Sequence, residues 1–429
     1  MPAALKVALA GLGTVGAGVV KLMDANRDLI TRRAGRPIDI VAVSARDRNR
    51  DRGIDMSRFT WAETQDLATL PSVDVVAELI GGSEGAALDL ARATIANGRG
   101  FVTANKAMIA HHGLELAAQA ETAGVALKYE AAVAGGIPVI KGLREGAAAN
   151  EIESVYGILN GTCNYILTTM EAEGRDFGAV LADAQALGYA EADPAFDVDG
   201  IDAAHKLSIL ASLCFGTRID FAAVGTTGIR QVLAGDIAQA KALGFRVRLV
   251  GRAEAAPDGL LQSVQPCLVP VSHPLSHVAG AMNAVVAQGN FVGRLFFEGR
   301  GAGEGPTASA VVADLIDIAR GEFGPAFAMP VASLAHPGRA DSGARVGRFY
   351  LRFTVADRPG VLAEITAAMR DAGVSIESLI QRGEAPDGGV LLVMTTHACP
   401  EANVAAVVVQ LSGSPILVGV PMLMPILDV

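Results

Sequence analysis

One stretch of the chain gathers acidic side chains around a single lysine. In GYAEADPAFDVDGIDAAHK (188–206) the lysine is Lys206, and the acids are Glu191, Asp193, Asp197, Asp199 and Asp202. GIDAAHK reads as the start of a helix, so Asp202 and Lys206, four residues apart, lie on one face. A surface ion pair of this spacing stabilises a helix by only about 0.3–0.5 kcal/mol, which leaves the other acids unexplained.

Two further interpretations of this stretch can be compared. A calcium loop requires the spacing D-x-[DN]-x-[DN]-G followed by a bidentate glutamate, and the stretch does not match it. A pocket for an amino acid fits better, because carboxylates can hold an ammonium group while a lysine sits at the reacting oxygen. Lysine acts as a base near neutral pH only where burial or a neighbouring cation favours its uncharged form.

A second lysine lies where ligands of parallel sheets bind. Lys106, in TANKAMIA, directly follows a predicted strand in GRGFVTANK (98–106). The carboxyl ends of parallel strands form the ligand-binding edge of such sheets. Near a nicotinamide and a carbonyl, Lys106 could move a proton or hold a carboxylate; the alternative is a solvated surface lysine.

The N-terminus carries a glycine pattern between a strand and a helix. GLGTVG places Gly11, Gly13 and Gly16 in G-x-G-x-x-G spacing, with Thr14 and Val15 between them. Such glycines permit a tight turn and close approach of the backbone to a pyrophosphate at the helix N-terminus. We interpret the pattern as a dinucleotide-binding turn rather than a merely structural one.

The end of the second predicted strand bears on the choice of cofactor. A fold that selects NAD usually offers Asp or Glu there for the ribose 2′-hydroxyl. In IVAVSARDR this place is taken by Ser44, with Arg46 and Arg48 beyond it. A hydroxyl and a guanidinium suit a 2′-phosphate, so NADP is favoured over NAD; alternatively, the arginines only pair with neighbouring aspartates.

The segment NGTCNY (160–165) raises the possibility of a nucleophilic cysteine. A reactive thiol needs a histidine or a helix N-terminus beside it, and no histidine is close to Cys163 in sequence. The small and polar neighbours, Thr162 among them, indicate a backbone turn that lines a pocket. His205 points to a different helix face from Lys206 and is expected to be structural.

Global properties of the chain exclude several classes of protein. Its 429 residues predict two or three domains, and a net charge of −10 argues against nucleic-acid binding. Four widely separated cysteines predict a reduced, cytoplasmic protein without structural zinc. Neither a signal peptide nor an unbroken apolar run long enough for a membrane span is found in the sequence.

The pattern of strands and helices changes twice along the chain. Up to residue 136, buried strands alternate with helices, which predicts an α/β domain with a Rossmann-type doubly wound parallel sheet. Residues 137–304 predict an inserted α+β domain with helices at 175–187, 200–215 and 236–244. Residues 321–346 are rich in Gly, Pro and Ala and predict a linker. Residues 347–429, with a turn at 385–389, predict a ferredoxin-like βαββαβ unit.

Together these motifs resemble the homoserine dehydrogenase family, in the form without a fused aspartokinase. The resemblance covers nearly the whole chain and is carried by GLGTVG, ELIGG (78–82), TANK (103–106), EAAVAGGIPVI (130–140), NGTCNYIL (160–167), the acid–lysine stretch and GAGEGPTASAVVAD (301–314). The acid–lysine stretch is the most specific of these. The C-terminal unit, with DRPGVLAEI, resembles an ACT domain, a regulatory module that binds small molecules.

The resemblance implies a reaction and a set of site residues. The reaction is the NAD(P)-dependent interconversion of L-homoserine and L-aspartate 4-semialdehyde in threonine, methionine and isoleucine biosynthesis. Lys206 matches the family's proton donor and acceptor, and Lys106 matches a lysine near the nicotinamide and the substrate. Glu191, Asp197 and Asp202 match substrate-binding acids, and Thr162 lies beside them. Gly303 lies near the cofactor, and helix 305–320 returns to complete the first domain.

The family also implies a monovalent cation and further partners. The matching cation positions, with sodium as the usual ion, are Glu130 and the backbone carbonyls of Val133, Gly135 and Ile137. One departure is Arg300, where many relatives have proline. The ACT unit implies an amino-acid effector such as L-threonine, and its apolar strands predict pairing into a homodimer or homotetramer.

Two other functions remain open from the sequence. An aspartate-semialdehyde dehydrogenase would form a thioester on a cysteine and would require phosphate. An amino-acid sensor would bind its ligands without turnover, although it would have no need of a proton-transfer lysine.

Overall fold

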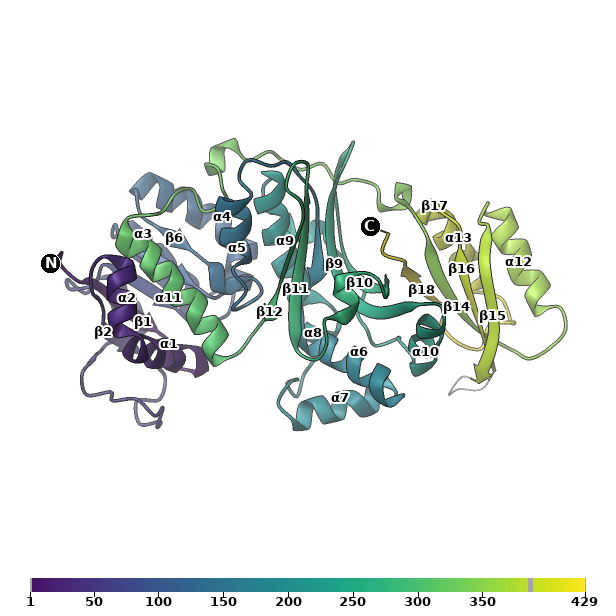
Figure 1. Cartoon of the computed structure of the whole chain (residues 1–429), viewed down its shortest axis with the longest axis horizontal. Helices are drawn as coiled ribbons and strands as arrows, with labels where there is room; N and C mark the ends of the chain where they lie inside the picture. Colours follow the sequence, from purple (N-terminus) through teal and green to yellow (C-terminus); the bar gives the residue numbers. More distant parts are fainter. Residues whose placement is uncertain (1, 385–388, 429) are drawn as a thin grey trace.

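The computed structural model describes residues 2–384 and 389–428. A parallel sheet lies toward the N-terminal end of the molecule, a mixed sheet lies in the middle, and an antiparallel sheet lies toward the other end (Figure 1). Most of the predicted turn at 385–389 lies outside the described residues. In the part of the chain that is described, no helix combines the length and apolarity needed to cross a membrane.

The N-terminal sheet is parallel, with strand order β3-β2-β1-β4-β5-β6. Its strands are β1 (Leu5–Ala10), β2 (Ile38–Ser44), β3 (Thr60–Trp61), β4 (Val75–Glu78), β5 (Gly100–Thr103) and β6 (Leu127–Lys128). Its helices are α1 (Thr14–Ala25), α2 (Arg27–Ala34), α3 (Ala86–Ala96), α4 (Lys106–Ala123) and α11 (Glu304–Arg320).

Helices cover both faces of this sheet. On β1, Leu5, Val7 and Leu9 pack in the cluster that contains α1 and α11. Ala8 and Ala10 pack in the cluster that contains α3 and α4. Successive side chains of a strand point to opposite faces, so a strand covered on both sides is apolar throughout. The predicted doubly wound sheet is confirmed.

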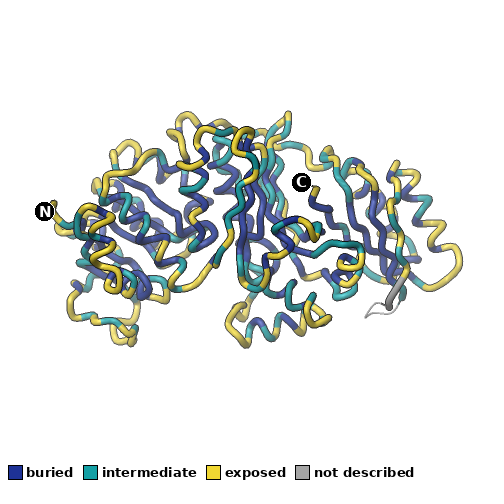
Figure 2. Tube along the Cα trace, in the orientation of Figure 1, coloured by how far each residue is buried: buried dark blue, intermediate teal, exposed yellow. Residues whose placement is uncertain are grey.

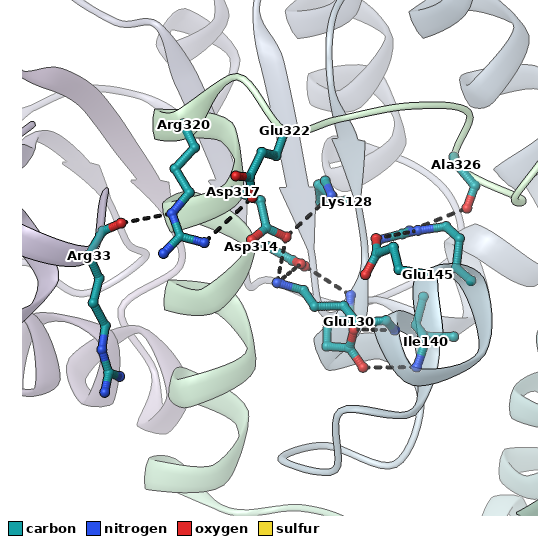
Figure 3. Close-up of polar contacts among 12 residues, drawn as sticks. Arg33, Lys128, Glu130, Ile140, Glu145, Asp314, Asp317, Arg320, Glu322 and Ala326 are labelled. Atoms are coloured by element: carbon teal, nitrogen blue, oxygen red, sulfur yellow. Dashed lines mark hydrogen bonds and ion pairs between the residues drawn. The ribbon is translucent and has the colours of Figure 1, made fainter. Parts of the chain in front are cut away.

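Helix α11, distant in sequence, packs against α1 at close range. A Cβ on Gly18 of α1 would lie 2.6 Å from Cγ of Glu304, so only glycine permits this approach. Near the C-terminal end of α11, Asp317 pairs with Lys128 at 3.3 Å and with Lys141 at 2.6 Å (Figure 3). Asp314 accepts the backbone N–H of Glu130 at 2.9 Å. The helix therefore reaches the segment where the first domain passes into the second.

The middle sheet is mixed, with strand order β12-β11-β7-β9-β10-β8. Its strands are β7 (Ile152–Ile158), β8 (Gly225–Thr226), β9 (Phe245–Ala256), β10 (Gly259–Pro270), β11 (Met282–Gly289) and β12 (Gly293–Arg300). Its helices are α5 (Val139–Lys141), α6 (Gly161–Glu173), α7 (Phe177–Ala186), α8 (Ala195–Val198), α9 (Ile201–Phe215) and α10 (Ala234–Ala242). Helix α9 is buried at every position from Asp202 to Leu213 and packs against both the sheet and α4.

The C-terminal unit has the predicted βαββαβ order. Its sheet runs β15-β16-β14-β18, formed by β14 (Phe349–Val355), β15 (Ile376–Glu384), β16 (Val390–Thr396) and β18 (Met422–Pro425). Helices α12 (Val361–Asp371) and α13 (Glu401–Leu411) pack on it. A separate two-stranded pair is formed by β13 (Val346–Gly347), just before β14, and β17 (Cys399–Pro400), just before α13.

A buried ion pair joins this unit to the middle domain. Nε of Arg352 lies 3.0 Å from Oδ1 of Asp236 on α10, and the Tyr350 hydroxyl donates to the same oxygen at 2.8 Å. All three residues are buried. The C-terminal unit is therefore docked on the middle domain.

The predicted linker at 321–346 has little regular structure but is packed in place. Ala326 accepts the Tyr129 hydroxyl at 2.7 Å, and Phe327 is fully buried. Single-turn helices complete the fold: η1 (Thr64–Ala68), η2 (Glu130–Ala132), η3 (Gly142–Gly146), η4 (Phe221–Ala223), η5 (Pro274–His277), η6 (Val331–Ser333) and η7 (Ser342–Ala344). Burial is greatest along the strands, while the outer sides of the helices are exposed (Figure 2).

Candidate active site

A cavity of about 810 Å³ opens between the N-terminal and middle domains. One wall comes from the glycine turn and from the end of β5, and the other comes from the first turns of α6 and α9. The lining includes Val15, Ala104, Lys106, Asn160, Thr162, Tyr189, Asp197, Asp202, Lys206, Asn283, Arg300 and Gly303. The cavity thus brings together both lysines, two of the acids and Val15 of the GLGTVG motif that the sequence singled out.

Asp202 forms the electrostatic centre of this cavity. Its Oδ2 lies 2.7 Å from Nζ of Lys206, one turn along α9, and its Oδ1 lies 3.0 Å from Nζ of Lys106. Burial alone would raise the pKa of Asp202, but the charges of Lys206 and Lys106 hold it well below its usual value. Asp202 is therefore a carboxylate that binds two ammonium groups supplied by two different domains.

Lys206 is held at a defined place in the wall. Its Nζ donates to Oδ2 of Asp202 and, at 2.8 Å, to the backbone carbonyl of Leu159 at the end of β7. The residue is buried, with 8% of its surface exposed. An ammonium group has three donors, so one remains directed to neither of these acceptors and can serve a ligand.

Asn160 was not identified from the sequence, and the structure places it among the acids. Its Oδ1 caps α6 by accepting the N–H of Cys163 at 2.8 Å. Its Nδ2 donates to Asp197 and to Asp202, each at 2.8 Å. Burial and the charge of Asp202 raise the pKa of Asp197. Asparagine is a preferred N-cap residue, so a helix prediction starting at Gly161 would have been the signal that finds it.

The glycine turn has the geometry that the dinucleotide pattern predicts. Gly11 has a φ of +100°, and a Cβ there would lie 2.7 Å from the Leu79 carbonyl. A Cβ on Gly16 would lie 2.1 Å from the Gly11 carbonyl, whereas one on Gly13 would meet no atom of the described chain within 4 Å. Gly11 and Gly16 therefore serve the turn itself, and Gly13 leaves space beside Thr14, the first residue of α1.

At the end of β2, the candidate ribose-binding residues differ in exposure and in their contacts. Ser44 is buried, and its hydroxyl contacts Thr64. Arg48 pairs with Glu63 at 3.2 Å, and Nε of Arg52 donates to the Leu12 carbonyl at 2.9 Å. Arg46 is exposed and forms no ion pair with a described residue. Arg46 and Arg48 are both exposed, and of the two only Arg46 forms no ion pair with a described residue.

The remaining candidate residues of the substrate site lie in three different environments. Glu191 is exposed and does not line the cavity, although Gly188 and Tyr189, just before it, do. Thr162 lines the cavity and donates to the Tyr189 carbonyl at 2.9 Å. Cys163 is fully buried, and burial raises the pKa of its thiol well above the usual value. This thiol lacks the properties of a nucleophile.

The turn at 130–137 carries buried carbonyl groups. The Glu130 carboxylate accepts the N–H groups of Ile140 and Lys141, each at 2.9 Å (Figure 3). Its burial, together with Asp314, raises the pKa of Glu130 to about 7. Among described residues, no backbone N–H donates to the carbonyls of Val133 or Gly135. The Ile137 carbonyl accepts the N–H of Val139 at 2.7 Å.

A glycine turn at a helix N-terminus, facing two lysines and their shared carboxylate across an interdomain cavity, defines a nicotinamide-dependent oxidoreductase. Family models support this class: a homoserine dehydrogenase NAD-binding domain matches residues 11–130, a homoserine dehydrogenase domain matches residues 138–316, and an ACT domain matches residues 349–408. The chain belongs to the homoserine dehydrogenase family.

Individual relatives and solved structures agree with this assignment. The homoserine dehydrogenase of Pseudomonas aeruginosa is 44% identical, with 93% of each chain covered, and that of Neisseria gonorrhoeae is 42% identical, with 94% of each chain covered. A crystal structure of the Thiobacillus denitrificans enzyme superimposes with a TM-score of 0.93 at 41% identity, covering 99% of each chain. A hyperthermophilic archaeal homoserine dehydrogenase in complex with NADPH superimposes with a TM-score of 0.65 at 25% identity, covering 76% of this chain and 100% of that one.

Proposed function

We propose that the interdomain cavity interconverts L-homoserine and L-aspartate 4-semialdehyde, with Lys206 as the group that moves the proton. The observation that carries this assignment is the contact of both lysines with Asp202 in a cavity that Val15 of the dinucleotide motif also lines. When bound, the nicotinamide accepts or donates the hydride at C4 of the substrate. In the reduction direction, the ammonium group of Lys206 gives a proton to the carbonyl oxygen as the hydroxyl forms, and in oxidation the hydroxyl proton returns to the same nitrogen.

The other polar residues bind and orient the substrate. Asp197 and Asp202 hold the substrate ammonium, and Asn160 keeps the two carboxylates together through its Nδ2. Lys106 lies between the cofactor side and Asp202 and orients the reacting oxygen. Glu191 completes the ammonium site only when the segment at 188–193 folds over the cavity, because its side chain is exposed in the structure.

The cofactor-binding residues are those of the glycine turn together with Gly303 and the end of β2. Gly13, Thr14 and Val15, at the N-terminus of α1, would hold the pyrophosphate. NADP is favoured over NAD because Arg46 is exposed and lacks an ion-pair partner among described residues. A guanidinium at this place complements a 2′-phosphate.

A monovalent cation, sodium in the first instance, fits the turn at 130–137. The carbonyls of Val133 and Gly135 are buried without a hydrogen-bond donor among the described residues, and buried carbonyls need a partner. Ala134, which is not a glycine, has a φ of +57°. Such strained backbone is retained where the surrounding structure has a use for it. Glu130 and Ile137 flank these carbonyls.

The remaining proposals concern regulation and organisation. The domain division is 1–136 with helix 305–320, then 137–304, a linker at 321–346 and a regulatory ACT unit at 347–429. L-threonine is the proposed effector of the ACT unit. The proposed reaction belongs to threonine, methionine and isoleucine biosynthesis. A homodimer or homotetramer is supported by β15, an edge strand whose Leu379 is exposed.

The test is steady-state oxidation of L-homoserine with NAD and with NADP, each with and without L-threonine. Turnover establishes the reaction, and the ratio of the two kcat/KM values tests the role of Arg46. Inhibition by L-threonine assigns the effector. Protein that binds a cofactor but shows no turnover would instead be an amino-acid sensor. The buried, high-pKa thiol of Cys163 argues against a thioester-forming semialdehyde dehydrogenase.

A further inference from the structure

The two lysines of the site are carried by helices of different domains. Lys106 begins α4 of the N-terminal domain, and Lys206 lies on α9 of the middle domain. The two helices pack against each other, and Asp202 joins them through its contact with Lys106. The relative position of α4 and α9 therefore sets the distance and orientation between the cofactor side of the cavity, near Lys106, and the substrate side, near Lys206.

A second polar contact joins the same helices close to the first. Nε2 of His111 on α4 lies 3.1 Å from Nε2 of His205 on α9. His205 is three residues after Asp202, on the same side of α9. The α4–α9 contact thus contains an ion pair that reaches the site and a histidine pair one turn away from it.

The surroundings of His205 fix its ring. The residue is 4% exposed, its ring stacks on Phe221 with centroids 4.4 Å apart, and Phe196 lies 5.6 Å from it. Burial, reinforced by the neighbouring His111 and Lys106, lowers the pKa of His205 to about 4. The imidazole is therefore neutral under the conditions in which a biosynthetic enzyme works.

Two imidazole nitrogens that share a hydrogen bond need one donor and one acceptor. Nδ1 of His205 is buried and has no hydrogen-bond partner among the described residues. A proton there would be a buried, unpaired N–H, which is costly, so the proton belongs on Nε2, where it is donated to Nε2 of His111. His111 is exposed, so its other ring nitrogen, Nδ1, can exchange hydrogen bonds with water. The contact is therefore a directed hydrogen bond from α9 to α4.

We propose that His205 is a positioning residue which, through its hydrogen bond to His111, fixes α4 against α9 and so aligns Lys106 and the cofactor side with Asp202 and Lys206. Hydride transfer requires reacting atoms about 3–3.5 Å apart, and a misplacement of about 1 Å can cost on the order of 10²-fold in rate. The inference rests on the proposed function. The simpler alternative is a histidine that only fills the core.

The first test compares two replacements of His205. His205→Phe keeps an aromatic ring against Phe221 but removes the hydrogen bond, whereas His205→Gln places an N–H donor at a similar reach. We expect His205→Phe to lower kcat by about tenfold with both KM values within about twofold, and His205→Gln to recover most of the loss. His112→Gln is the matched control, because His112 lies on the same helix and contacts Glu84 at 2.6 Å.

Two further readouts separate positioning from packing. With L-homoserine deuterated at C4, His205→Phe should show a larger isotope effect on kcat than the wild type, because poorer alignment slows the hydride step. In a Lys106→Ala background, His205→Phe should add little further loss, because both changes act through one contact region. If the kcat losses of the two single variants multiply in full in the double variant, the proposal is overturned.

Other outcomes are also decisive. If His205→Phe lowers only the unfolding temperature and leaves kcat and the isotope effect unchanged, His205 is a core residue. Should His205→Phe fail to fold, His111→Phe removes the same hydrogen bond from the exposed partner, and an unchanged kcat there overturns the proposal. Absence of homoserine turnover in the wild type rejects the proposed function and the inference with it, whereas normal wild-type turnover with unaffected variants rejects the inference alone.

Discussion

Replacing Asp202 by asparagine keeps the shape of the side chain and removes its charge. In the wild type this buried carboxylate accepts from Lys206, Lys106 and Asn160 at 2.7–3.0 Å. Asp202→Asn leaves two ammonium groups facing a neutral amide. Because one lysine is buried, the change resembles the breaking of a buried ion pair rather than the loss of a surface one.

The cost can be worked out from the exposure of each partner. Breaking a buried ion pair by removing one partner costs about 3–5 kcal/mol, whereas an exposed pair contributes about 0–1 kcal/mol. The Lys206 side chain is 11% exposed and that of Lys106 is 33% exposed, so the loss comes mainly from Lys206. We expect about 3 kcal/mol, which lowers the unfolding midpoint by roughly 6–12 °C. Activity should fall by about 10²-fold in kcat, because both lysines lose their anchor.

The assay is thermal unfolding followed by circular dichroism, together with steady-state homoserine oxidation. The matched control is Asp199→Asn, since Asp199 pairs with Arg230 in the same stretch but on the surface. That variant should lie within about 1 kcal/mol of the wild type. An Asp202→Asn protein as stable and as active as the Asp199→Asn control would refute the reasoning.

The same carboxylate gives a stability component that depends on pH. The pKa of Asp202 is depressed in the folded state, so the unfolded state binds more protons as the pH falls. The stabilisation is complete above the unfolded-state value of about 4 and is lost as the pH falls below it toward the folded-state value. Acid unfolding of Asp202→Asn should therefore be less steep below about pH 4 than that of the wild type.

Further predictions concern other parts of the molecule. Lys206→Ala should lower kcat by about 10²–10⁴-fold with a much smaller change in KM, as steady-state kinetics would show; an unchanged kcat would remove it from the proton-transfer role. Arg46→Ala should raise KM for NADP by about tenfold and leave that for NAD unaltered, which initial-rate measurements with each cofactor would reveal. Arg352→Met should destabilise the docked C-terminal unit by about 3 kcal/mol, because it leaves the buried Asp236 unpaired; equilibrium urea unfolding measures this, and a loss below about 1 kcal/mol would contradict it. Because the pKa of His205 is lowered to about 4, the wild type should lose stability as the pH falls from about 6.5 toward 4, and His205→Phe should lack this component when its unfolding is followed across the same range.

Local sequence patterns predicted many elements of the fold, although helix α6 and strands β10, β11 and β12 were not predicted. The G-x-G-x-x-G turn, the alternation of buried strands with helices and the βαββαβ order each depend on residues near one another in the chain, and all three are present in the structure. The Asp202–Lys206 pair was predictable for the same reason, because a spacing of four residues brings two side chains together in any helix.

The contacts between domains could not be read in the same way. His111 and His205 are 94 residues apart, and Asp236 and Arg352 are 116 apart, so no local pattern relates either pair. Asn160 carries an N-cap signal, but nothing near it in sequence indicates that its amide holds two distant carboxylates. The exposure of Glu191 likewise depends on how the segment at 188–193 packs.

The sequence by itself therefore determined the alternation of strands and helices in the first domain, the place of the dinucleotide turn and the pairing of Asp202 with Lys206. Only the tertiary structure decided that Asp202 is shared by lysines of two domains, that Cys163 is a buried thiol and that α4 meets α9 through a histidine pair. The physical reason is that periodicity and turn chemistry act within a few residues of the chain, whereas burial and charge pairing depend on which surfaces the folded domains bring together.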